Sequence, residues 1–147
     1  MEAEDIRLAE HFAFRSSLPI DELCGAIRAE LGLPEFSYDR ENETEWGCVA
    51  HDGLEYDVSR PYEDGTLRAW DPSVPLHCNV GMTISVGNGA PHPRDAAESR
   101  ADIVPRVGQA LADLFLLPVY HHRTWLGPGK NVARADLFRP RNRQRTR

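Results

Sequence analysis

The chain has 147 residues, 41% of them hydrophobic and 27% charged, and its formal net charge at pH 7 is −6. This length predicts a single domain that buries enough apolar surface to fold without a disulfide or a bound metal. The acidic balance disfavours nucleic acid as the main partner, because phosphate binding needs clustered Lys and Arg, and no apolar run reaches the roughly 18 residues of a membrane-spanning helix.

Charge and cysteine content indicate how the chain is divided and where it works. We expect one α+β domain over residues 1–138 and a basic, disordered tail over residues 139–147, which holds five Arg and no acid. Only this tail has the composition to contact nucleic acid. Cys24, Cys48 and Cys78 lack paired spacing and are typical of small buried hydrophobic residues in a reducing compartment. Because the acidic N-terminus lacks an apolar secretory segment, we expect a cytoplasmic protein without a membrane partner.

The first third of the chain predicts a strand, a helix and the start of a hairpin. Residues 11–15 alternate between apolar and polar side chains, as a strand does. Pro19 and the acids at 21–22 mark the start of a helix whose apolar stripe continues to residue 31, and Gly32 ends it. Residues 36–57 alternate again and turn at Asp52–Gly53, which predicts a β-hairpin.

The alternation within this hairpin sorts its side chains between two faces. Trp46 and Cys48 share one face of the outgoing strand, and the glutamates at 41, 43 and 45 share the other. On the return strand, Tyr56 lies on the same face as Leu54 and Val58, so we expect Tyr56 in the core.

The remaining elements follow with shorter connections. Residues 62–75 are rich in turns around a short strand at 66–70, and the clearest strand covers residues 77–86. A second helix is expected from about residue 99 or 102 to residue 117, and Pro105 falls in its first turn if residue 102 is the N-cap. A strand follows at 119–126. The order contains two strand–helix–strand units. It predicts an α+β two-layer sandwich in which an antiparallel sheet carries two helices on one face, ferredoxin-like (split βαβ) or a variant of it.

The most unusual feature of the sequence is its acidic middle. From Glu35 to Asp64 there are ten carboxylates and only two arginines, interleaved with aromatic residues. Facing like charges cost about 0.2–1 kcal/mol per pair in a sheet, so their accumulation indicates a binding surface for a basic protein. The alternative is a solvated face that uses charge to prevent aggregation. The candidate partner-binding residues are Glu41, Glu43, Glu45, Trp46, Asp52, Glu55, Asp57, Tyr62, Glu63 and Asp64.

A second cluster lies in the last predicted strand and the turn after it. Charged and aromatic side chains beside a loop often bind ligands, so an enzyme or ligand-binding module with its site here is an alternative, and a solvated strand face is another. The residues of this alternative ligand site are His121, His122, Arg123, Trp125 and Lys130. No His or Cys spacing predicts a metal site, and the glycines at 87 and 89 lack a complete phosphate-binding pattern. We therefore expect no catalytic residues, no metal and no cofactor.

The α+β organisation, the acidic aromatic stretch from Tyr38 to Tyr62, and the segments 70–75 and 122–125 resemble small immunity proteins of bacterial polymorphic-toxin and contact-dependent inhibition systems. The resemblance implies a cytosolic protein without catalytic activity that neutralises a cognate toxin domain by covering its active site or an essential surface. Many such toxins are nucleases with basic clefts, which an acidic face would complement. A structural or regulatory homodimer is the remaining alternative.

Overall fold

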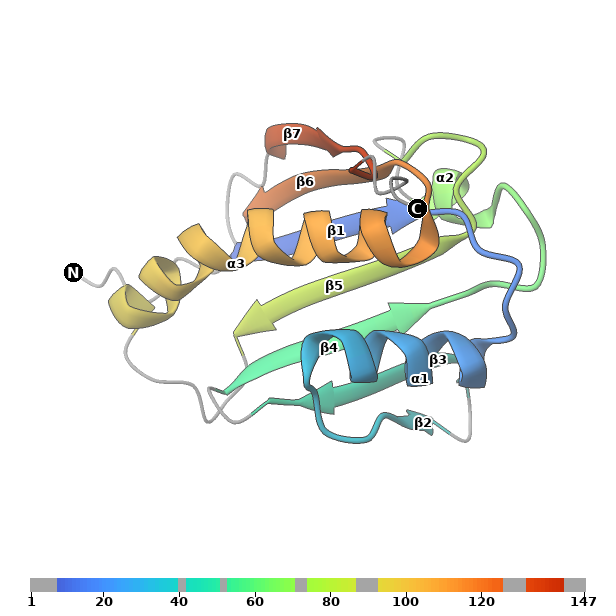
Figure 1. Cartoon of the computed structure of the whole chain (residues 1–147), viewed down its shortest axis with the longest axis horizontal. Helices are drawn as coiled ribbons and strands as arrows, with labels where there is room; N and C mark the ends of the chain where they lie inside the picture. The colour runs from blue at the N-terminus through green and yellow to red at the C-terminus, as the bar shows by residue number, and fades with distance from the viewer. Residues whose placement is uncertain are drawn as a thin grey trace, which may run out of the picture.

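A computed structural model shows an α+β protein with one open sheet of seven antiparallel strands, in the order β2-β3-β4-β5-β1-β6-β7 (Figure 1). The structure describes residues 8–39, 42–50, 53–70, 74–86, 93–125 and 132–141. The strands are β1 (Leu8–Phe14), β2 (Ser37–Asp39), β3 (Asn42–Val49), β4 (Leu54–Ser59), β5 (Val80–Val86), β6 (Val119–Trp125) and β7 (Val132–Phe138). The helices are α1 (Ile20–Leu31), α2 (Thr66–Trp70) and α3 (Pro93–Phe115). Within the described ranges, no helix is long and apolar enough to cross a membrane.

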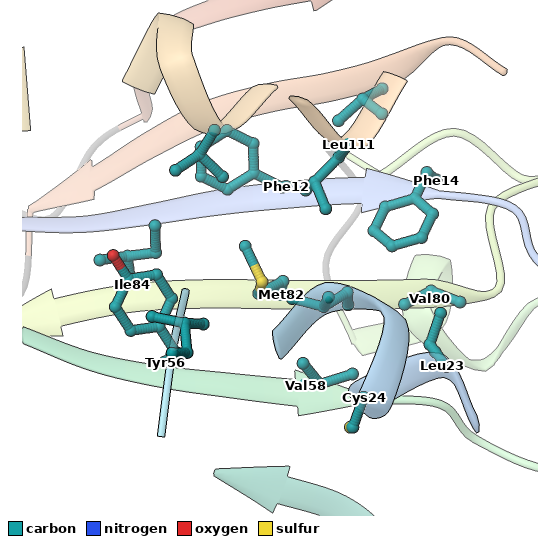
Figure 2. Packing of buried hydrophobic residues seen from close by; sticks show 14 of the residues in the cluster. Phe12, Phe14, Leu23, Cys24, Tyr56, Val58, Val80, Met82, Ile84 and Leu111 are labelled. Atoms are coloured by element: carbon teal, nitrogen blue, oxygen red, sulfur yellow. The ribbon is translucent and has the colours of Figure 1, made fainter. Parts of the chain in front are cut away.

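Helices α1 and α3 cover one face of the sheet and share its main core (Figure 1). The apolar stripe of α1 buries Leu23 and Ile27, and that of α3 buries Val107 and Leu111. Alternate residues of the central strands meet these helices, as Figure 2 shows for Phe12, Phe14, Tyr56, Val58, Val80, Met82 and Ile84. The predicted core position of Tyr56 is thereby confirmed.

A smaller apolar cluster lies on the opposite face, under α2. It contains Ala13 of β1 together with Leu67, Val74 and Cys78, and Tyr120 packs against it. This cluster covers only the end of the sheet at which β1 finishes and β5 begins. Beyond this cluster, that face carries polar side chains such as Asp57 and Thr83, together with the exposed Val49.

Several predicted elements differ from the observed ones. The segment 66–70 is a helix and not a strand, because Ala69 N–H donates to the carbonyl of Gly65 and only Leu67 is buried. The strand predicted over 77–86 begins at Val80, since Cys78 N–H closes a turn onto Pro75.

Helix α3 and the end of the sheet also differ from the sequence-based expectation. Helix α3 begins at Pro93, so Pro105 lies in the helix interior and not in the first turn. The outgoing arm of the predicted hairpin contains two strands, β2 and β3. Strand β7 is absent from the sequence-based expectation; it pairs with β6 and sets Phe138 opposite Val119.

The basic end of the chain begins against α3. The Arg141 side chain donates from Nε to Oδ2 of Asp113 at 2.8 Å, and the Arg141 backbone N–H donates to Oδ1 at 2.8 Å. Burial alone would raise the pKa of Asp113, but the hydrogen bonds from Arg141 and Gln109 and the Arg141 charge outweigh it and lower the pKa to about 2. The disorder expected for the rest of the tail concerns residues 142–147, which lie outside the described residues.

We predict that Gly108→Ala destabilises the protein by about 1–3 kcal/mol, because a Cβ at this position would overlap the Phe138 ring and force α3 and β7 apart. Gly25→Ala in α1 is the matched control, since a Cβ there meets nothing within 4 Å. Its higher helix propensity should stabilise the protein by about 0.5–1 kcal/mol. Urea denaturation measures the free energy of unfolding of both variants. Equal stabilisation by the two changes would show that β7 does not pack on α3.

Candidate functional site: the open face of the sheet

One row of residues crosses the sheet on the face that α1 and α3 leave open. Directly opposite residues in antiparallel strands share a face, so the pairing of six strands places their side chains in one line. In sheet order from β2 to β6 the row is Ser37, Gly47, Asp57, Thr83, His11 and His122. The row therefore runs from an acidic half, where Asp57 has Glu45 of β3 and Glu55 of β4 on either side of the row, to a histidine pair on β1 and β6.

The acidic half forms the first hollow of this face. Glu45 of β3 and Glu55 and Asp57 of β4 line it, together with Glu35, in a volume of about 660 Å³. Its described lining contains these four carboxylates and no Lys, Arg or His. The described part of this hollow therefore presents negative charge without a basic side chain in its lining.

Gly47 makes the position of Asp57 possible. A Cβ at Gly47 would collide with Oδ1 of Asp57, so only a glycine lets this carboxylate lie across β3. Partial burial raises the pKa of Asp57 to about 6, and the negative charges of Glu55 and Glu45 add to the effect. Asp57 nevertheless remains exposed, so a partner can reach it.

A second hollow of about 440 Å³ shares Glu45 and Asp57 with the first and extends toward the histidine pair. Leu67 and Trp70 of α2 line this hollow, together with Val74. The remaining lining includes Ser59, Gly81, Thr83, His11 and His122.

The histidine pair is held in place from two sides. The rings of His11 and His122 stack with their centroids 4.7 Å apart and their planes 18° apart. On the other side, Nδ1 of His11 lies 3.2 Å from Oγ1 of Thr83. The pair is thus a fixed wall of the second hollow.

The predicted partner-binding residues divide between the two faces of the sheet. Glu45, Glu55 and Asp57 lie together on the open face. Trp46 lies on the face of the helices, partly buried against the main core, and Tyr62 lines a separate hollow beside it.

The other predicted partner-binding residues lie elsewhere or outside the described part. Asp64 is exposed and pairs with Arg15 at 3.1 Å, and Glu63 is exposed in the same turn. Glu41 and Asp52 lie outside the described residues, as does the side chain of Glu43.

The alternative ligand site does not come together as one cluster. His121 points under the helices, where its Nε2 lies 2.8 Å from Oε1 of Glu10 and both side chains are almost fully buried. His122 points to the open face instead. The side chains of Arg123 and Trp125, and all of Lys130, lie outside the described part of the chain.

Four residues of the open face are absent from the sequence-based predictions: His11, Ser59, Trp70 and Thr83. Alternation alone assigns Thr83 to the polar side of its strand and Ser59 to the side of Asp57. The strand order that brings β1 beside β5, and α2 beside both, cannot be read from alternation. The place of Trp70 was predicted wrongly for a different reason: its segment was expected to be a strand and is a helix.

The three cysteines are poor nucleophiles. Burial raises the pKa of Cys24 to about 12, with contributions from Cys48 and Asp21. Burial likewise raises the pKa of Cys48 and of Cys78 to about 11. Among the described residues, no group of three or more His, Cys, Asp or Glu side chains could hold a metal ion.

We predict that Asp57→Asn stabilises the protein at pH 7 by on the order of 1 kcal/mol. This is less than the full pKa shift of Asp57 implies, because solvent screens a carboxylate that is partly exposed. The folded-state pKa of about 6 lies above the ordinary aspartate value of 3.8, so ionisation of Asp57 costs stability above pH 6. The advantage of the variant should disappear as the pH falls from 6 toward 4. Urea denaturation across this pH range measures it. A gain that grows toward low pH would contradict the environment assigned to Asp57.

Comparison with known proteins supplies no relative from which a role could be transferred. No protein-family model, curated protein or solved structure matches this chain.

Proposed function

We propose that this protein is a non-catalytic binding protein that neutralises a basic partner through the open face of its sheet. The partner class that best fits is a cognate toxin domain with a basic cleft, such as a nuclease. The observation that supports this most directly is the gathering of Glu45, Glu55 and Asp57 on one uncovered face, around a hollow whose described lining has no basic side chain. Such a surface attracts a basic cleft and speeds encounter.

Two further observations support a binding surface over a merely solvated face. The raised pKa of Asp57 means that its charge is held at a cost to stability, which a solvated carboxylate avoids. Exposed apolar side chains also flank the carboxylates: Val49 is 56% exposed on β3, and Trp70 is 61% exposed on α2. Apolar anchors beside complementary charge are typical of protein–protein interfaces.

We infer that the fold is a variant of the ferredoxin-like split βαβ sandwich. In the order β4-β5-β1-β6, α1 lies in the connection between β1 and β4, and α3 joins β5 to β6. Strands β2, β3 and β7 are then additions at the two edges. In this reading the acidic surface lies on an added strand, β3, and on its neighbour β4.

We place the protein in the cytoplasm, where a partner of this kind would have to be neutralised. The free thiols of Cys24, Cys48 and Cys78 support a reducing compartment. The poor nucleophilicity of these thiols and the burial of His121 support a role without covalent chemistry.

The proposal is tested with two variants that each remove two negative charges. Glu45→Gln/Asp57→Asn changes the open face, whereas Glu22→Gln/Glu30→Gln changes exposed positions on α1. The binding probe is the purified C-terminal domain encoded by the reading frame directly upstream of the gene for this chain. We expect the open-face variant to bind at least about tenfold more weakly, with a flatter dependence on salt, and the α1 variant to bind like the parent.

Surface plasmon resonance at several salt concentrations measures both affinities and association rates. Equal affinities for the two variants, or no binding of the parent protein, would contradict the proposal. Light scattering of the free protein separates the remaining alternative, because a structural homodimer would show twice the monomer mass.

A further inference from the structure

We propose that the second hollow is a binding pocket for one arginine side chain of the partner, with the guanidinium between Trp70 and the carboxylates of Asp57 and Glu45. This inference rests on the proposed function, and it specifies which group of a basic partner the open face recognises. It assigns roles to α2 and to Ser59 that the acidic surface alone does not require.

The shape of the hollow suits a long side chain with an apolar stem. Leu67 lies over Gly81, where a Cβ would be 3.5 Å from Cδ2 of Leu67, so α2 closes one end of the sheet face. Val74 and Ala13 continue this apolar wall. Arginine buries its methylene groups against such walls while its charged end stays beside polar groups.

The charge in the hollow suits a cation. Asp57 and Glu45 are diagonal neighbours across β3 and β4, so one group between them can contact both. The described lining has no Lys or Arg that would neutralise them. The stacked rings of His11 and His122 form another wall of the hollow.

Two features favour arginine over lysine. Trp70 offers a largely exposed indole at the mouth of the hollow, and a planar guanidinium stacks on such a ring while it donates to carboxylates in the same plane. Ser59 lines the floor, and among the described residues its buried Oγ has no hydrogen-bond partner. Arginine has five N–H donors in a fixed fork, enough to serve Ser59 as well as two carboxylates.

The test uses the full-length protein and three short peptides that differ at one position: Ac-Gly-Arg-Gly-NH₂, Ac-Gly-Lys-Gly-NH₂ and the citrulline analogue of the first. NMR titration follows the backbone amides of Ser59 and Thr83 and the indole N–H of Trp70. We expect the arginine peptide to shift these signals with a millimolar dissociation constant, the lysine peptide to bind at least several-fold more weakly, and the uncharged citrulline peptide to leave them unchanged.

Two variants separate stacking from general exposure. Trp70→Ala should weaken binding of the arginine peptide roughly tenfold. Tyr62→Ala is the matched control, because Tyr62 is 75% exposed but lines a different hollow, and it should leave binding unchanged. Gly47→Ala should also weaken binding, since it moves the Asp57 carboxylate without changing the net charge. A thermal melt of each variant confirms that it is folded.

The outcomes distinguish this inference from the proposed function. Suppose that the upstream-encoded domain binds the parent protein and loses affinity with Glu45→Gln/Asp57→Asn but not with Trp70→Ala. The proposed function is then supported, and the arginine pocket is wrong. If the arginine peptide binds as expected while that domain does not bind, the arginine pocket is supported and the proposed function is wrong. Equal binding of the arginine and lysine peptides would overturn the preference for guanidinium.

Discussion

The position of β4 between β3 and β5 decides what both faces of the sheet contain. Each residue of β4 has a fixed partner on either side, so Val58 meets Trp46 and Met82 while Asp57 meets Gly47 and Thr83. Because side chains alternate, a slip of one residue would turn the carboxylates into the core and the apolar residues into solvent. Burial of Tyr56 and Val58 under α1 therefore holds Glu55 and Asp57 on the open face.

The open face combines features that a purely structural surface does not need. The Asp57 carboxylate lies over Gly47. Partial burial and the charges of Glu55 and Glu45 raise its pKa to about 6. A short helix carries an exposed tryptophan to the edge of the same hollow. Like charges and exposed aromatic rings each oppose stability or solubility when nothing binds them, and both become favourable when a basic partner covers them.

Much of the fold could be predicted from local patterns, and the failures share one physical origin. Helix α1, strand β6 and the core position of Tyr56 follow from periodicity, because each presents one apolar stripe or face. Strand β7 carries Arg134 and Asp136 among its apolar residues, so its pairing with β6 leaves no clear pattern in the sequence. The alternation also separated Glu45 from Trp46. It could not show that β1 lies beside β5, and so it missed the wall formed by His11 and the place of Trp70.

The central claim is that the carboxylates of the open face meet basic groups of a partner. The most direct measurement is the NMR titration of the Asp57 side-chain carboxyl, first in the free protein and then in the complex with the upstream-encoded domain. The free protein should titrate with a pKa of about 6. Nearby cations should lower the pKa in the complex below about 4. An unchanged pKa on binding would contradict the account, because it would place the partner on another surface.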